Sequence, residues 1–90
     1  MSKRGSNRDG LLRVLIYPVQ FEADPIDGID RVINEIIPNM NAVSKSSEDY
    51  LNAIESGLES SDELSLLLPQ THSEKVIRRY LREVRRRLKT

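Results

Sequence analysis

The sequence contains no cysteine and no tryptophan, and aromatic residues make up only 4% of its 90 residues. Without cysteine there is no disulfide framework and no thiolate metal site, so we expect a protein of a reducing compartment, the cytoplasm. Long apolar runs are missing as well, and none approaches the roughly 20 residues that span a bilayer. We expect the basic N-terminus not to be a secretion signal, because Arg13 interrupts the apolar run after it and no small-residue cleavage site follows.

The common motifs of catalysis and metal binding are also missing. The first two glycines have the spacing of a phosphate-binding loop, but a leucine stands where that loop needs its lysine. Asp24, Asp27 and Asp30 are three residues apart, unlike the alternate ligands of a calcium loop. His72 lies in a polar stretch just before the last predicted helix, which favours a solvated or capping role over catalysis. We therefore expect no enzymatic activity, no cofactor and no metal site.

A chain of 90 residues forms a single domain, because two independent cores would not fit. Residues 1–10 are polar and lack apolar periodicity, which predicts a mobile basic tail before a small helical domain over residues 11–90. Leu11–Glu22 is rich in branched and aromatic residues, which favours a strand. Pro18 confines that strand to an edge or splits it, and a short helix over residues 11–17 remains an alternative.

Two helices are predicted in the middle of the chain, each with a start signal followed by apolar residues at helical spacing. Asp24 and Pro25 open a helix that ends at Pro38, and its apolar stripe is Ile26, Ile29, Val32, Ile33, Ile36 and Ile37. Ser47 caps the next helix, and its stripe is Tyr50, Leu51, Ile54 and Leu58.

A last helix is predicted near the C-terminus. Thr71 and Glu74 have capping-box spacing before it, and its stripe is Val76, Ile77, Tyr80, Leu81, Val84 and Leu88. A short helix over residues 64–68 and a loop over residues 39–46 complete the chain. The sequence thus predicts a mainly α fold, a small bundle of three to four short helices with an extended or β N-terminal segment.

A formal net charge of zero hides three charged blocks. Residues 1–13 carry a net charge of +3, residues 21–63 carry −9 and residues 72–90 carry +6. The blocks can attract one another inside the fold, although single surface ion pairs are weak. The distribution of charge, and not its total, therefore bears on partners.

The acidic block predicts a surface for a basic protein partner. Acidic residues favour helix N-termini, which accounts for several of the carboxylates but less well for Glu55 and Glu59. Together with Glu48 these two fall within a narrow arc of the helical wheel, beside Leu51 and Leu58. Charge would steer the encounter, and an apolar or aromatic anchor would hold it. The predicted partner-binding residues are Glu48, Tyr50 as the anchor, Glu55, Glu59, Asp62 and Glu63.

The last predicted helix offers a second surface. Its basic residues lie opposite its apolar stripe, and a continuous basic face can follow the phosphates of a nucleic acid. No aromatic residue is interleaved with them, so a solvated face that complements the helix C-terminus is the other interpretation. The alternative nucleic-acid-binding residues are Arg78, Arg79, Arg82, Arg85, Arg86 and Lys89.

The C-terminal half also resembles a known family. The runs YLNAIESGL from residue 50, LSLLLPQTHS from residue 64 and IRRYL from residue 77 are similar in style to small bacterial immunity proteins that accompany contact-dependent inhibition toxins. The resemblance implies a cytoplasmic, non-enzymatic protein that binds and blocks a cognate toxin, often a nuclease. The near-neutral pI of about 6.6 departs from the strongly acidic pattern of many nuclease inhibitors. A homodimer that pairs amphipathic helices or the Leu11–Tyr17 edge is a further alternative.

Overall fold

The structure is a computed structural model that describes residues 2–38 and 47–89. The α-helical elements are α1 (Ser2–Ile16), α2 (Ile29–Arg31), α4 (Ser47–Glu59) and α5 (Glu74–Lys89). The 3₁₀ and π turns are η1 (Tyr17–Val19), η2 (Pro25–Gly28), η3 (Val32–Ile36) and η4 (Leu64–Leu66). The mainly α bundle is confirmed, and the described residues contain no strand. The loop predicted over residues 39–46 lies outside them.

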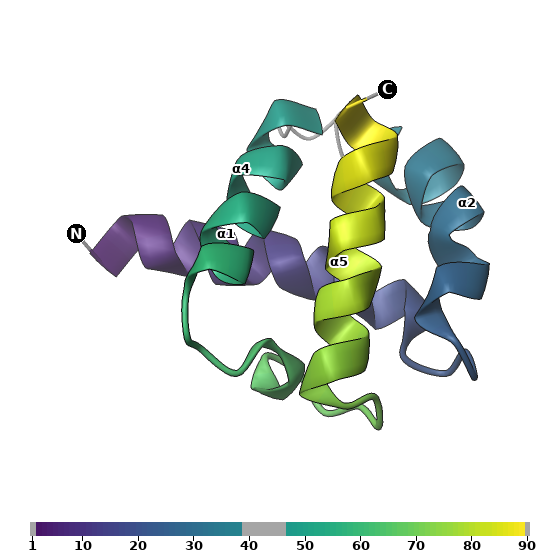
Figure 1. Ribbon diagram of the computed structural model, residues 1–90. Helices are drawn as coiled ribbons and strands as arrows, with labels where there is room; N and C mark the ends of the chain where they lie inside the picture. The colour runs from purple at the N-terminus through teal and green to yellow at the C-terminus, as the bar shows by residue number, and fades with distance from the viewer. Residues whose placement is uncertain (1, 39–46, 90) are drawn as a thin grey trace.

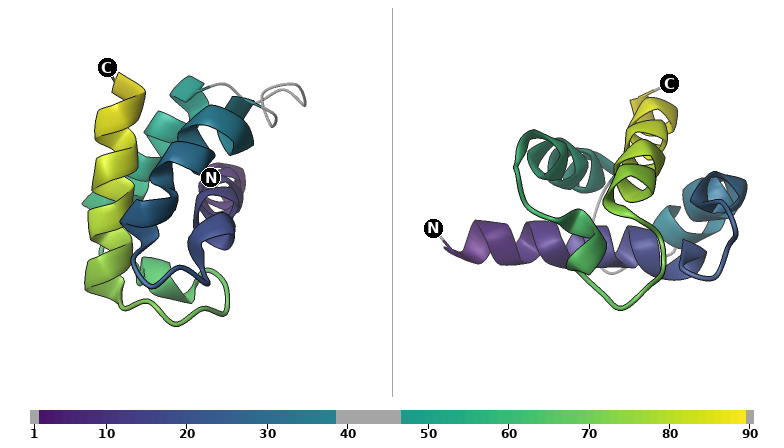
Figure 2. Two further views of the ribbon diagram at one scale, coloured as in Figure 1. Left: turned by 90° about the vertical axis from the view of Figure 1, so that its right-hand side faces the viewer. Right: turned by 60° about the horizontal axis from the view of Figure 1, so that its bottom comes forward.

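Helices α4 and α5 form one layer, and α1 packs across one side of this layer. Figure 1 shows α4 and α5 side by side and antiparallel, with α2 on the other side of α5. Figure 2 shows α1 running across one side of this layer, so that one face of α4 and α5 points away from it. The core lies between the layers and is built from aliphatic side chains together with two buried tyrosines, Tyr50 and Tyr80.

Helix α1 extends to Ile16, so the strand predicted over Leu11–Glu22 is wrong, and the alternative of a short helix over residues 11–17 is closer to what is found. The buried side chains show why. Four of them recur at the three- and four-residue spacing of a helix: Leu12, Leu15, Ile16 and Val19. The branched composition favoured a strand, but burial follows the helical period. Pro18 lies in the first turn of η1, where its missing N–H is tolerated.

The segment before Leu11 has helical backbone too. Because α1 begins at Ser2, residues 2–10 of the predicted mobile basic tail have the backbone of this helix. The Arg8 side chain pairs with the carboxylates of Asp9 and Asp62, at 2.9 and 2.8 Å. The mobility of this segment stays a prediction.

The helix predicted from Asp24 to Pro38 is found, although its geometry changes along its length. Asp24 is the N-cap, because its carboxylate accepts a 3.0 Å hydrogen bond from the backbone N–H of Ile26. The chain then passes from the 3₁₀ turn η2 through α2 into the wider π-helical turn η3. In such a turn residues five apart approach one side, and Val32 and Ile37 are accordingly both buried.

The two buried tyrosines differ in hydrogen bonding, which allows a matched test of the core. The Tyr80 hydroxyl donates a 2.6 Å hydrogen bond to the carbonyl oxygen of Leu15, whereas the Tyr50 hydroxyl has no partner among the described residues. We expect Tyr80→Phe to lower the free energy of unfolding by about 1 kcal/mol. Tyr50→Phe should leave it unchanged or raise it, because it removes a buried hydroxyl without a partner. Urea denaturation measures both values, and equal losses would contradict this assignment.

Candidate functional site

The outward face of α4 carries most of the predicted acidic surface. Its exposed or half-exposed positions recur at helical spacing: Glu48, Asn52, Glu55 and Glu59. The opposite side of the helix faces the core: Tyr50, Ala53, Ile54 and Gly57. Because the two sets lie about half a turn apart on the helical wheel, the carboxylates point away from the core. We call Glu48, Glu55 and Glu59 the α4 acidic strip.

Only part of this acidic surface is neutralised within the fold. Glu55 Oε2 lies 3.1 Å from Lys89 Nζ at the end of α5, and Asp62 Oδ2 lies 2.8 Å from Arg8 Nη2. Three exposed carboxylates form no ion pair with another described residue: Glu48, Glu59 and Glu63. These three therefore keep their negative charge available to solvent or to a partner.

Tyr50 cannot be the predicted anchor, because its side chain is 0% exposed. Its spacing from Ile54 on the apolar stripe already turns it toward the core. Burial, and then the neighbouring Asp49 carboxylate, raise the pKa of its hydroxyl. The apolar side chains that a partner can reach beside the strip are instead Leu51 and Leu58, which are half-buried.

The basic face of α5 divides into paired and unpaired side chains. Three are paired within the fold: Arg79 with Asp24, Arg86 with Glu83 and Lys89 with Glu55. Two form no ion pair with another described residue: Arg82 and Arg85. A shallow hollow runs along this side of the helix, lined by Ile26, Arg79, Arg82, Glu83, Arg85, Arg86 and Lys89. Five of the six predicted basic residues thus share one surface.

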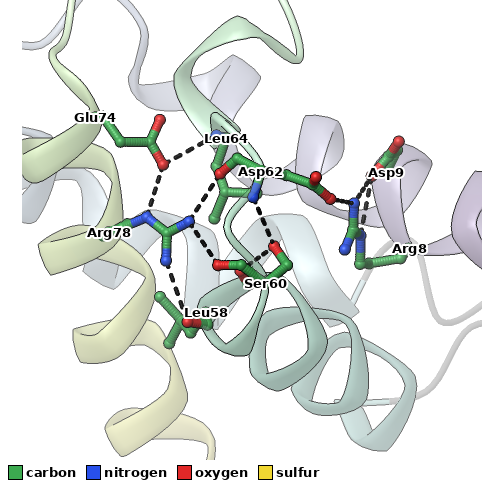
Figure 3. A network of polar contacts seen from close by, with 9 residues as sticks. Arg8, Asp9, Leu58, Ser60, Asp62, Leu64, Glu74 and Arg78 are labelled. Atoms are coloured by element: carbon green, nitrogen blue, oxygen red, sulfur yellow. Dashed lines mark hydrogen bonds and ion pairs between the residues drawn. The ribbon is translucent and has the colours of Figure 1, made fainter.

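Arg78, the sixth, is turned into the fold (Figure 3). Its Nε donates a 2.7 Å hydrogen bond to the carboxylate of Glu74. The other two guanidinium nitrogens donate to backbone carbonyl oxygens at and after the end of α4: Leu58 at 3.1 Å, Ser60 at 3.1 Å and Asp62 at 2.7 Å. Carbonyl groups at a helix C-terminus lack intrahelical donors. Arg78 provides these donors from the neighbouring helix α5. Its inclusion in a nucleic-acid-binding face was wrong.

Glu74 completes this contact. Its carboxylate accepts hydrogen bonds from the backbone N–H groups of Leu64, at 3.0 Å, and Ser65, at 2.7 Å. The pair Glu74 and Arg78, which we call the α4–α5 clamp, therefore holds the end of α4 and the first half of the connection against the start of α5 (Figure 3). Because the Glu74 carboxylate is engaged in this way, it does not form the predicted capping box with Thr71. The N-cap of α5 is Ser73, whose Oγ accepts a 3.3 Å hydrogen bond from the backbone N–H of Val76.

His72 has a structural contact. Its Nε2 lies 3.1 Å from the carbonyl oxygen of Val19, which ties the segment before α5 to η1. Its backbone N–H donates a 2.7 Å hydrogen bond to the side chain of Gln70. The shallow hollow beside it, lined by residues 20–23 and 69–72, contains one carboxylate, that of Glu22. Across residues 2–38 and 47–89, no group of three or more His, Cys, Asp or Glu side chains could hold a metal ion.

Three large apolar side chains are exposed that the sequence did not single out. They are Tyr17 at 66%, Phe21 at 92% and Leu66 at 73%. Exposed aromatic residues are frequent contacts in protein interfaces. The sequence carried one signal for this exposure. If the apolar residues of Leu12–Val19 are read at helical spacing, Tyr17 lies outside the buried stripe. Within the described part of the chain, no helix is long and apolar enough to cross a membrane.

Comparisons with protein-family models, curated proteins and solved structures gave no significant match. The resemblance to immunity proteins therefore stays an expectation. The function has to be inferred from the two charged surfaces and from the clamp that positions them.

The clamp predicts a specific loss of stability in acid. Burial acts to raise the pKa of Glu74, but the N–H groups of Ser65 and Leu64 and the Arg78 guanidinium outweigh it and hold this pKa below its ordinary value of 4.5. A lowered pKa in the folded state stabilises the protein above the unfolded pKa, and this contribution is lost as the pH falls through the folded pKa. We expect the free energy of unfolding of the wild type to decrease below about pH 4.5.

Glu74→Gln should be less stable than the wild type at neutral pH and should show a flatter dependence in acid. Urea denaturation at a series of pH values measures both effects. Glu63→Gln is the matched control, because Glu63 is an exposed carboxylate of the same connection without an ion pair to a described residue. Parallel curves for wild type and Glu74→Gln would contradict the role given to this carboxylate.

Proposed function

We propose that this chain is a non-enzymatic binding protein of the immunity type, which binds and blocks a cognate bacterial toxin through the α4 acidic strip. The observation that carries the proposal is that Glu48 and Glu59 stand on the outward face of α4 without an ion pair to another described residue. Carboxylates that are not neutralised internally project a negative potential, which attracts a basic surface and steers its approach.

The strip suits the inhibition of a toxin that acts on nucleic acid. A nuclease has to expose cationic side chains to hold the phosphates of its substrate. A helix with carboxylates along one face can occupy those side chains and exclude the substrate. Leu51 and Leu58 border the strip and supply apolar contacts in place of the buried tyrosine. Glu63, exposed in the connection after α4, extends the acidic surface beyond the helix.

The proposed role places the protein in the cytoplasm. A sequence without cysteine suits a reducing compartment, where disulfides do not persist. A toxin that reaches the cytoplasm meets its inhibitor there. Inhibition of this kind requires a matched surface and no chemistry from the protein.

The α4 acidic strip can be tested by charge reversal. We expect Glu48→Lys together with Glu59→Lys to slow association with the toxin and to weaken affinity by about 10- to 100-fold, because attraction becomes repulsion. The partner for the test is the C-terminal domain of any large secreted protein that the genome encodes next to this chain. Stopped-flow kinetics and titration calorimetry measure the rate and the affinity.

The matched control is Glu22→Lys together with Glu35→Lys, which makes the same change in net charge at exposed positions outside α4. The control should lose much less affinity than the strip variant. Equal losses for the two variants, or unchanged binding by the strip variant, would show that the α4 acidic strip is not the binding surface.

One observation favours a second candidate function, the binding of a nucleic acid by α5. The hollow along α5 brings five basic side chains to one surface, and Arg82 and Arg85 have no ion pair to another described residue. Such a surface can follow a phosphate backbone without reading its sequence. Glu83 lies in the same hollow and pairs with Arg86, which reduces its positive charge.

Salt dependence tests this second function. If α5 binds DNA or RNA, the logarithm of the affinity should fall linearly with the logarithm of the salt concentration. Arg82→Gln together with Arg85→Gln should lower the magnitude of that slope by about 2, whereas Arg13→Gln together with Arg31→Gln, both exposed and outside α5, should change it less. Fluorescence anisotropy with a labelled duplex measures the slope, and no binding at low salt would eliminate the candidate.

A further inference from the structure

The two antiparallel helices of the upper layer present opposite charges side by side (Figure 1). Every exposed position of α5 is basic, and these positions recur at alternating four- and three-residue spacing: Lys75, Arg79, Arg82, Arg86 and Lys89. We call this set the α5 basic strip. The α4 acidic strip runs next to it on the neighbouring helix. The outward face of the layer is therefore divided lengthwise into a negative half and a positive half.

Both halves keep charge that forms no ion pair among residues 2–38 and 47–89. Glu48 and Glu59 on α4, and Lys75 and Arg82 on α5, form no ion pair with another described residue. The strips meet at the pair of Glu55 and Lys89, whose charged atoms are 3.1 Å apart. The face thus offers unpaired negative charge on its α4 side and unpaired positive charge on its α5 side.

The ends of the two strips are also in register. Arg78, near the start of α5, reaches the carbonyl oxygen of Leu58 at 3.1 Å, so the Glu59 end of α4 lies beside the Lys75 end of α5. Because the helices are antiparallel, Glu48 lies toward the other end of α5. A rotation of half a turn about an axis parallel to the helices exchanges the two halves of the face and keeps this register.

We propose that a second copy of this chain docks on this face, related by such a two-fold axis, so that each α4 acidic strip lies over the α5 basic strip of the other copy. An isologous contact requires a surface that is complementary to itself, and a face divided between two signs of charge meets this requirement. A partner of one charge sign that covered both strips would match only half of the face and would be repelled by the other half. A second copy matches both halves at once.

The dimer is weak and depends on ionic strength. Exposed ion pairs contribute little individually, and salt screens charges that are more than about 8 Å apart at physiological ionic strength. The self-association constant should therefore fall at least about tenfold between low and high salt. An interface held mainly by apolar contacts would respond in the opposite direction or very little.

Two charge-reversal variants and their mixture test the arrangement. The first carries Glu48→Lys and Glu59→Lys, and the second carries Lys75→Glu and Arg82→Glu. Neither removes an ion pair between described residues, so circular dichroism should show both variants folded. In sedimentation experiments at low salt each variant alone should be monomeric at concentrations where the wild type dimerises. An equimolar mixture should dimerise again, because the lysines introduced on α4 of one copy then lie over the glutamates introduced on α5 of the other.

Several outcomes would overturn the proposal: a wild type that stays monomeric up to about 1 mM at low salt, a dimer that neither variant weakens, or a mixture that stays monomeric. Glu22→Lys together with Glu35→Lys should dimerise like the wild type. If a reversal variant does not fold, Glu48→Gln with Glu59→Gln removes the same charges without adding repulsion and should still weaken the dimer. The experiment uses this chain alone, so a negative result does not contradict the proposed function. A failure to bind the toxin would likewise not contradict the dimer.

Discussion

The arrangement of the molecule depends on the contacts of one guanidinium group, that of Arg78. Carbonyl groups at the end of a helix have no intrahelical donor, and the planar fork of an arginine can satisfy several of them at fixed angles. Here the fork reaches from α5 to the carbonyl oxygens of Leu58, Ser60 and Asp62, while Glu74 holds it from the other side. The contact fixes the end of α4 against the start of α5. The alignment of the acidic and basic strips on the surface is therefore a consequence of a polar contact inside the fold.

The charged blocks of the sequence do attract one another, through a few ion pairs between elements. Each of four ion pairs joins the acidic block to one of the two basic blocks: Asp24 with Arg79, Asp30 with Arg87, Glu55 with Lys89 and Asp62 with Arg8. On the outward face of α4, Glu55 pairs with Lys89, whereas Glu48 and Glu59 form no ion pair with another described residue. Position on the helix thus decides which charges stabilise the fold and which face a partner.

Local signals predicted much of this structure, and tertiary contacts account for what they missed. Asp24 and Ser47 begin helical segments as predicted, because capping and apolar spacing are properties of adjacent residues. The helical period of Leu12–Val19 was obscured by branched residues that also suit strands. The wheel placed Glu48, Glu55 and Glu59 on the outward face of α4 correctly, and the same wheel turned Tyr50 inward, against its assignment as an anchor. The inward turn of Arg78 was beyond prediction, because its acceptors lie up to 20 residues away along the chain.

The two proposals use the same carboxylates, and this relation constrains both. A toxin bound to the α4 acidic strip and a second copy docked over it would compete for Glu48 and Glu59, so the two complexes exclude each other. Self-association lowers the concentration of free monomer. The apparent dissociation constant for the toxin then equals the intrinsic constant divided by the fraction of the chain that is monomeric. A dimer held by exposed ion pairs leaves that fraction large at low protein concentration, whereas a nuclease site with concentrated positive charge and apolar contacts binds more tightly. If both proposals hold, competition favours the toxin, and the dimer covers the acidic strip only while no stronger basic partner is present.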